Sequence, residues 1–352
     1  MYKLSIVGTV GVPACYGGFE TLVENLLVEK NNKEYLVYAS SRSYSKKINS
    51  YKNADIKYLP FKANGTQSII YDVLSILHSA FILKPQNILI LGVSGTLILP
   101  FVRPFFKGKI ITNIDGLEWK RDKWNRLVKK FLKFSEKLAV KYSDIVITDN
   151  QGISDYVFKE YDTKSMTIAY GGNIPEYLDK IETKQKEYYL KICRIEPENN
   201  VEMVLKAFSI HTDSKLILVG NWNASNYGKS LRKNYISFDN IKMLDPIYDP
   251  QKLHILRSEC AGYIHGHSAG GTNPSLVEIM HYGKIIYAYD CIYNRYTTNN
   301  ISRFFSSPES LISLLKKNSN NDDILNECHA IKNYARLNYS WEKIREKYLS
   351  CI

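Results

Sequence analysis

The stretch GYIHGHSAGGTNPSLVEIM, residues 262–280, combines a short apolar run, a glycine turn and a helical pattern. Pro274 suits the first turn of such a helix, because its fixed φ fits helical geometry and its missing N–H is not needed there. The same order recurs in KICRIEPENN at 191–200, which leads into the helical pattern VEMVLKAF. Repetition of this strand, turn and helix unit is typical of α/β proteins with parallel sheets.

Apolar runs of this kind alternate with helical patterns along both halves of the chain. Parallel sheets covered on both faces require such strands, because neither face meets water. Between the halves, 171–187 has the glycine, proline and charge content of a connector. We therefore expect two doubly wound α/β domains, 1–174 and 175–337, with ligands bound at the carboxyl ends of their strands. The runs are KLSIVG (3–8), YLVYA (35–39), ILILG (88–92), KIITNI (109–114), DIVIT (144–148), MTIAY (166–170), YYLKIC (188–193), KLILVG (215–220), IKML (241–244), GYIHG (262–266) and KIIYAY (284–289).

Length and charge restrict the class of protein. The 352 residues favour two domains of about 150 to 180 residues each. The net charge of +12 indicates an anionic partner. Charge alone does not decide whether this partner is a nucleic acid, a membrane or a phosphate-bearing substrate. Six scattered cysteines without a C-x-x-C pair fit neither a disulfide framework nor a zinc site, and they suggest a reducing compartment. We expect no signal peptide and no membrane span.

The first glycine loop is GTVGVPACYGGFETLVENL at 8–26. Gly17 and Gly18 stand directly before a predicted helix, where backbone N–H groups can approach a phosphate or a sugar. The spacing matches neither a dinucleotide fingerprint nor a P-loop. Simple turn glycines are the alternative.

Two further motifs predict contacts with a diphosphate and a ribose. Free amides around Asn273 and Ser275 would hold a diphosphate, and Glu278, one helical turn on, would accept hydrogen bonds from ribose hydroxyls. Arg194, at the end of a strand, would neutralise a departing diphosphate. The alternatives are a helix-capping role for Ser275 and a surface ion pair for Arg194.

The stretch NIDGLEWKRDKW at 113–124 carries candidates for the acceptor. Asp115 follows a strand and would orient or deprotonate an acceptor hydroxyl, unless it only caps a turn. Trp119 and Trp124 would stack on a sugar or lie at a lipid headgroup layer, with core packing as the alternative.

A basic helix is predicted after this stretch. Nine basic and two acidic residues lie in 120–141, a local charge of +7. Their helical spacing is typical of a helix that lies on anionic lipid, each cation adding about 1 kcal/mol. A solvated outer helix is the alternative. The residues predicted to contact membrane or acceptor are Trp119, Arg121, Trp124, Lys129, Lys130, Lys133 and Lys137.

Taken together, these stretches resemble the GT-B-fold nucleotide-sugar glycosyltransferases of family 4, within them the bacterial subgroup of capsule and exopolysaccharide rhamnosyltransferases. The resemblance implies two Rossmann-like domains facing each other across a cleft. It implies an acceptor-binding domain at 1–174, a nucleotide-sugar-binding domain at 175–337, and a helix at 338–352 that crosses back to the first domain. The matching stretches are GTVGVPACYGGFETLVE (8–24), NIDGLEWKRDKW (113–124), AYGGN (169–173), CRIEPENN (193–200), HGHSAGGTNPSLVEIM (265–280) and YSWEKIREKYL (339–349).

The resemblance also implies site residues, with two departures from the usual pattern. Gly270 stands where the first glutamate of a Glu-x7-Glu motif is usual, and Asn199 replaces a lysine near the diphosphate. We interpret both as donor specialisation. The implied catalytic residues are Asp115 and Arg194, and the implied donor-binding residues are Gly17, Gly18, Arg194, Asn199, Gly271, Thr272, Asn273, Ser275 and Glu278.

We therefore expect a retaining glycosyltransferase that uses dTDP-L-rhamnose, or else a UDP-sugar, and a lipid-diphosphate-linked saccharide. The sequence has no Asp-x-Asp, so we expect no metal and no cofactor beyond the nucleotide-sugar. We expect a cytoplasmic protein that lies on the inner face of the bacterial cell membrane and does not bind nucleic acid. The alternatives are a GT-B-fold epimerase or glycosyl phosphorylase, and a non-enzymatic protein that binds anionic membranes; a nicotinamide-dependent oxidoreductase lacks its fingerprint.

Overall fold

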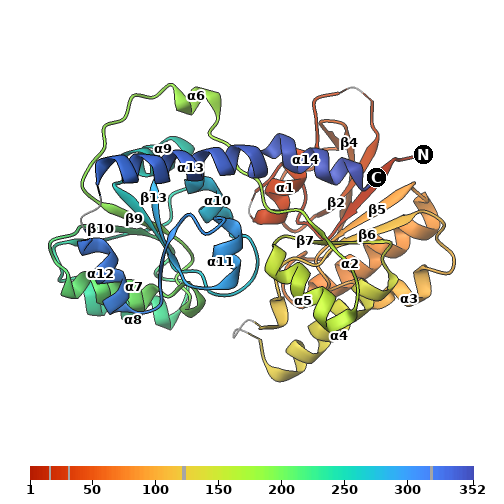
Figure 1. The fold of residues 1–352 in the computed structure, drawn as a ribbon. Coiled ribbons are helices and arrows are strands. Elements are labelled where there is room, and N and C mark those ends of the chain that lie inside the picture. The colour runs from red at the N-terminus through yellow and green to blue at the C-terminus, as the bar shows by residue number, and fades with distance from the viewer. Residues whose placement is uncertain (16, 31, 121–123, 318–319) are drawn as a thin grey trace. The chain divides into compact units, whose positions relative to one another are not determined.

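The computed structural model describes residues 1–15, 17–30, 32–120, 124–317 and 320–352. These residues form two compact units (Figure 1). Unit 1 comprises Met1–Tyr170 and Trp341–Ile352, and unit 2 comprises Gly171–Ser340. The predicted boundaries followed residues 174 and 337. Both units contain a sheet of mainly parallel strands, which confirms the predicted α/β fold class.

The described part of unit 1 contains an eight-stranded sheet in the order β3-β4-β2-β1-β5-β6-β7-β8. All neighbouring pairs are parallel except β3 and β4. Every residue of β1, β2 and β5 is buried, as a parallel sheet covered on both faces requires. The strands are β1 (Leu4–Val7), β2 (Tyr35–Ser40), β3 (Ser50–Tyr51), β4 (Ala54–Leu59), β5 (Asn87–Leu91), β6 (Lys109–Asn113), β7 (Ile145–Thr148) and β8 (Met166–Thr167).

The helices of unit 1 include one from the far end of the chain. Ile344 and Tyr348 of this C-terminal helix are buried in the core of unit 1. Asn113, at the end of β6, donates from Nδ2 to the Tyr348 hydroxyl at 2.6 Å. The helices are α1 (Gly18–Leu26), α2 (Gln67–Leu77), the π-helical turn η1 (His78–Leu83), η2 (Thr96–Ile98), α3 (Leu99–Val102), η3 (Glu118–Lys120), α4 (Arg126–Tyr142), α5 (Gln151–Tyr161) and α14 (Trp341–Ser350).

The described part of unit 2 contains a six-stranded parallel sheet in the order β11-β10-β9-β12-β13-β14. The strands are β9 (Tyr189–Ile192), β10 (Leu216–Val219), β11 (Ile241–Leu244), β12 (Gly262–His265), β13 (Ile285–Tyr289) and β14 (Arg303–Phe305). The helices are α6 (Glu176–Asp179), η4 (Pro197–Asn199), α7 (Val201–Ile210), α8 (Asn226–Tyr235), α9 (Pro250–Glu259), α10 (Pro274–Met280), α11 (Ile292–Thr297), α12 (Pro308–Lys316) and α13 (Asn321–Tyr339).

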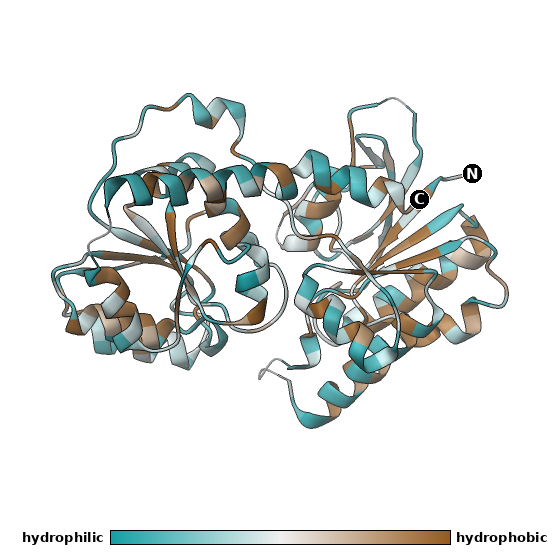
Figure 2. Ribbon diagram, viewed as in Figure 1, coloured by the Kyte–Doolittle hydropathy of each residue, from teal (hydrophilic) through white to brown (hydrophobic). Residues whose placement is uncertain are grey.

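Hydropathy follows this layering, with apolar strands inside each unit and polar turns of helix outside (Figure 2). Among the described residues, every helix is too short or too polar to cross a membrane.

Candidate functional site

Two loops at the carboxyl edge of the unit 2 sheet are joined side by side. One follows β9 and the other follows β12, the strand that pairs with β9. Asn199 Nδ2 donates to the Arg194 carbonyl at 2.9 Å, and Asn199 Oδ1 lies 3.0 Å from His267 Nδ1. The N–H and the hydroxyl of Ser268 each donate to the Glu198 carbonyl at 2.9 Å. The structure therefore brings together the motif at 191–200 and the motif at 262–280.

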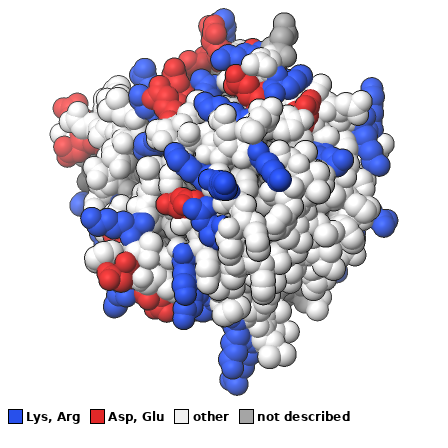
Figure 3. All heavy atoms as spheres, turned by 90° about the vertical axis from the view of Figure 1, so that its right-hand side faces the viewer, with Lys and Arg blue, Asp and Glu red and all other residues white. Residues whose placement is uncertain are grey.

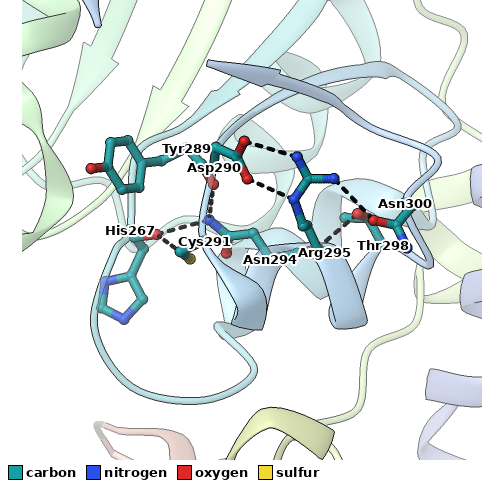
Figure 4. Close-up of polar contacts among 8 residues, drawn as sticks. All are labelled: His267, Tyr289, Asp290, Cys291, Asn294, Arg295, Thr298 and Asn300. Atoms are coloured by element: carbon teal, nitrogen blue, oxygen red, sulfur yellow. Dashed lines mark hydrogen bonds and ion pairs between the residues drawn. The ribbon is translucent and has the colours of Figure 1, made fainter. Parts of the chain in front are cut away.

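The loop after β12 is also held from the neighbouring strand (Figure 4). Asn294 of α11 donates from Nδ2 to the carbonyls of His267 and Tyr289, each at 2.8 Å. The next residue of α11, Arg295, forms a bidentate pair with Asp290 at 2.6 and 2.8 Å. These contacts anchor His267 to the connection between β13 and α11.

A buried lysine lies beneath the turn that carries Arg194. Lys191 of β9 is 1% exposed, and its Nζ donates to the Asn199 carbonyl at 3.0 Å. A Cβ at position 266 would lie 2.7 Å from this Nζ, so Gly266 makes room for the ammonium group. Burial lowers the pKa of Lys191. This residue was not predicted from the sequence, although a lysine inside an apolar run was a visible signal.

The side chain of Asn199 shapes the turn. Both of its polar atoms are engaged within the two loops, and the residue is 5% exposed. Arg194, by contrast, is exposed at the edge of the sheet. The asparagine thus fixes the turn that presents the arginine.

The start of α10 is capped by Asn273. Its Oδ1 accepts from the Ser275 N–H at 3.0 Å and from the Ser275 hydroxyl at 2.8 Å. The alternative in which Ser275 caps the helix is therefore wrong, because Asn273 performs this role. Gly270 adopts a φ of +91°, which glycine tolerates and a glutamate does not. Gly271 and Thr272 are buried between Gly270 and the cap.

Glu278 of α10 is paired with an arginine from another helix. Arg257 of α9 donates from Nη2 to Glu278 Oε2. The Glu278 side chain is 36% exposed and that of Arg257 is 12% exposed. Burial is the largest single effect and lowers the pKa of Arg257, but Glu278 together with Tyr282 and Tyr263 raises the pKa of the guanidinium overall. Arg257 was not predicted from the sequence, because α9 carries no motif.

The glycine loop of unit 1 is closed over a buried glutamate. Glu20, on α1, accepts from the Thr9 hydroxyl at 3.0 Å and from the Val10 N–H at 2.7 Å. Gly17 has a φ of +109°, and a Cβ there would lie 2.2 Å from Glu20 Oε2. A Cβ at Gly18 would meet only a Tyr170 ring, at 3.6 Å or more. The positive φ therefore favours glycine at 17, whereas a side chain at 18 would make only an ordinary van der Waals contact with Tyr170.

Asp115 stands at the carboxyl end of β6 in a left-handed conformation. Its φ is 61°, which costs a residue other than glycine about 1 to 3 kcal/mol. The Asp115 N–H donates to Asn113 Oδ1 at 2.8 Å, and this contact holds the turn. Such strain is frequent at functional sites. Because Asp115 follows the carboxyl end of β6, it lies at the edge where an α/β sheet binds ligands.

Trp119 belongs to an aromatic cluster around a buried carboxylate. Glu136 of α4, 2% exposed, accepts from Trp119 Nε1 at 2.9 Å and from the Tyr156 and Tyr161 hydroxyls at 2.7 Å each. Burial and Glu136 raise the pKa of Tyr156, so its hydroxyl stays protonated. Lys133 Nζ lies 4.7 Å from the Trp119 ring centroid. These contacts within unit 1 favour the packing alternative for Trp119.

Four predicted lysines of α4 line an open hollow of about 560 Å³ beside this cluster. Trp124 is not among the residues that line this hollow, and its Nε1 donates to Glu118 Oε1 at 3.0 Å. Arg121 lies outside the described residues. The lining residues are Trp119, Lys129, Lys130, Lys133, Phe134, Lys137, Glu160 and Tyr161.

Two family models match successive parts of the chain. Residues 1–173 match a domain of unknown function, DUF1972, and residues 173–338 match glycosyl transferases group 1. No curated protein matches the sequence.

Several solved structures share the fold along the whole chain. Sucrose-phosphate synthase from Thermosynechococcus elongatus matches with a TM-score of 0.79 at 12% identity, covering 100% of this chain and 98% of the other. HepE from Anabaena, solved in complex with UDP, matches with a TM-score of 0.70 at 13% identity, covering 100% and 99%. Trehalose 6-phosphate synthase from Burkholderia multivorans matches with a TM-score of 0.69 at 10% identity, covering 99% and 96%. The chain thus carries a DUF1972 domain followed by a glycosyl transferases group 1 domain on a GT-B fold, a combination that supports a glycosyltransferase.

Proposed function

We propose that this protein transfers L-rhamnose from dTDP-L-rhamnose to a lipid-diphosphate-linked saccharide during synthesis of a bacterial surface polysaccharide. The observation that carries the proposal is the joined pair of loops in the group 1 domain, which presents Arg194 while Glu278 lies on the helix that follows. The rhamnose donor and the lipid-linked acceptor rest on the resemblance of the motifs. A UDP-sugar is the alternative donor; HepE was solved with UDP.

Unit 2 supplies the groups that the donor needs. The exposed Arg194 can donate two parallel hydrogen bonds to the diphosphate, whose charge grows as the glycosidic bond breaks. Glu278, with one oxygen held by Arg257, keeps acceptor capacity for a ribose hydroxyl. Gly271 and Thr272 are buried residues of the same loop, and we propose that their backbone amides donate to the diphosphate. Arg194 and the amides of this loop stabilise the leaving diphosphate more strongly in the transition state than in the ground state, whereas Glu278 contributes to nucleotide binding in both.

Unit 1 supplies the acceptor side. Asp115 orients the acceptor hydroxyl, and Gly17 and Gly18 allow the donor sugar to approach the loop. We propose retention at the sugar carbon through a same-face displacement by way of an oxocarbenium-like state, without a metal ion. The sequence motifs offer no carboxylate nucleophile for a covalent intermediate.

The basic face of α4 supports a proposal of membrane attachment. Lys130 and Lys137 are exposed, whereas Lys133 is engaged with Glu136 and Glu160 at 3.6 and 2.9 Å. We propose that this face contacts the anionic cytoplasmic leaflet, where the lipid-linked acceptor lies.

A donor panel tests the proposal. The purified protein is incubated with a glucosyl-diphosphate-lipid analogue and with dTDP- and UDP-linked sugars in turn. Transfer from dTDP-L-rhamnose is expected. Conversion of the donor in the absence of acceptor would instead support an epimerase, and transfer only from another nucleotide-sugar would refute rhamnose as the substrate.

A further inference from the structure

Three segments of unit 1 expose cations without exposing acids. They are 67–84, 96–110 and 126–142, and they carry ten Lys and Arg residues against two acids. The acids are Asp72 and Glu136, which are 4% and 2% exposed. A charge of +8 out of the +12 of the whole chain therefore lies on these segments. Two of these cations pair with acids: Arg103 with Asp144, which lies outside the segments, and Lys133 with Glu136 and with Glu160, which also lies outside them. The cations are Lys84, Arg103, Lys107, Lys109, Arg126, Lys129, Lys130, Lys133, Lys137 and Lys141.

The same segments expose large apolar side chains. Phe101 and Phe105, at and just after α3, are 69% and 72% exposed, and Ile82 of η1 is 69% exposed. The rings of Phe81 and Phe105 lie 6.1 Å apart, so a side chain of η1 meets one from the turn after α3. Single exposed apolar residues are ordinary, but a contiguous group marks an interaction surface. We call Phe81, Ile82, Phe101 and Phe105 the aromatic edge.

The aromatic edge adjoins helices whose exposed residues have the same character. α2 runs directly into η1, and it exposes Ile70 and Leu74. α3 packs against α4, whose exposed residues Leu127 and Phe134 stand among its lysines. Figure 3 shows this side of the molecule as a broad uncharged area with Lys and Arg side chains at its margins.

We propose that the aromatic edge inserts into the interface of a bilayer containing anionic lipid, while the lysines around it contact the phosphates. Charge complementarity selects this occupant, because a surface with exposed cations and no exposed acid on its segments fits a negatively charged lipid plane. Long lysine side chains lie along apolar surface and extend their ammonium groups to the headgroups. The inference rests on the proposed function, which places α4 on the membrane, and adds an apolar anchor on η1 and α3.

An inserted anchor changes how binding depends on salt. The contacts of exposed lysines are screened within about 10 Å at 0.1 M salt, whereas burial of phenylalanine in lipid persists. The parent protein should therefore keep a bound fraction at 0.5 M NaCl. Removal of the aromatic edge should abolish that fraction.

The test is sedimentation of the full chain with phosphatidylglycerol/phosphatidylcholine vesicles. The variant F101S/F105S is compared with I236S/Y248S, whose parent side chains in unit 2 are 67% and 77% exposed. We expect at least a tenfold loss of partitioning for F101S/F105S at 0.5 M NaCl, and none for the control pair. Equal partitioning of the two variants would overturn the proposal. If the parent protein is a dimer in solution and F101S/F105S is a monomer, the proposal is overturned, because the aromatic edge then binds a second copy of this chain.

A second measurement reports insertion directly. Phe105→Trp should give a blue-shifted emission component that brominated lipid quenches, and Ile236→Trp should not. If the Phe105→Trp variant stays on the vesicles and its added emission component is unquenched, the contact lies at the membrane surface and insertion is overturned. Sugar transfer to a soluble acceptor separates this inference from the proposed function. The F101S/F105S variant should retain this activity. If the parent protein lacks the activity, the proposed function is refuted, and the vesicle measurements still decide whether the aromatic edge inserts.

Discussion

Arg257 and Glu278 form an ion pair between α9 and α10, in which the guanidinium donates to one carboxylate oxygen. The arginine is largely buried and the glutamate is partly exposed. Glu278 is thus held in a defined orientation, with acceptor capacity left on the solvent side. This pair gives the predicted ribose ligand a physical support that the motif alone did not reveal.

Glu278→Ala should weaken nucleotide-sugar binding. The change removes a charged acceptor for ribose hydroxyls and leaves Arg257 without its carboxylate, a loss of typically about 1 to 3 kcal/mol, or roughly 5- to 150-fold in affinity. With a deoxyribose donor the loss should be at the lower end. Calorimetric titration with dTDP and UDP measures it, with Glu176→Ala, an 87% exposed residue, as the control. An unchanged dissociation constant in folded Glu278→Ala would refute the assignment.

Arg194→Ala should lower turnover more than donor affinity. The diphosphate gains charge as the glycosidic bond breaks, and the side chain at 199 is an amide occupied by the turn. Arg194→Lys should restore only part of the rate, because it loses the fork geometry. Steady-state kinetics separate kcat from KM, and Arg232→Ala is a control from α8. Equal kcat for Arg194→Ala and parent would contradict this role.

The glycine and strand patterns predicted the fold class, because buried parallel strands leave clear apolar runs. The same patterns predicted Arg194 at the end of a strand and Glu278 on a helix, but only the structure shows that β9 and β12 pair, which brings the loops after these strands together. Arg257 and Lys191 were not predicted, because their roles depend on contacts with residues 21 and 8 positions away in the chain. The capping role of Asn273 was missed for a different reason: both Asn273 and Ser275 are good caps, and backbone geometry decides between them.

Unfolding stability should depend on Asp72 between acidic and neutral pH. Burial raises the pKa of Asp72 from 3.8 to about 7, and the Ser94 hydroxyl that donates to it lowers the pKa only in part. The folded state therefore binds a proton more tightly than the unfolded state does, so stability is full below about pH 4 and falls as pH rises toward 7. The loss is at most about 4 kcal/mol, from roughly three pKa units.

Asp72→Asn should remove this component and be more stable than the parent at pH 8. Denaturant unfolding at pH 5 and pH 8 measures the difference, with the exposed Asp239→Asn as the matched control. A parent and an Asp72→Asn variant with parallel pH profiles would contradict the assignment.

The lysines of α4 should govern salt-dependent membrane binding. Replacing Lys129, Lys130, Lys133 and Lys137 with Gln removes cations worth about 1 kcal/mol each near an anionic surface. Vesicle sedimentation at 0.1 M NaCl should show release of this variant, whereas the unit 2 set Lys180, Lys184, Lys229 and Lys233→Gln should bind as the parent does. Full sedimentation of the α4 variant would show that its lysines only face solvent, and inactivity on a soluble acceptor would place them in the catalytic site.

The most direct test of glycosyl transfer is mass spectrometry of the acceptor. The parent, Arg194→Ala and Glu278→Ala are incubated with dTDP-L-rhamnose and a glucosyl-diphosphate-lipid analogue. We predict that the parent adds one deoxyhexose to the acceptor and releases dTDP in equal amount, and that both variants add far less. The contradicting result is an acceptor that stays unmodified with every nucleotide-sugar of the panel. If this occurs under conditions in which the parent binds dTDP or UDP, the protein is not a glycosyltransferase.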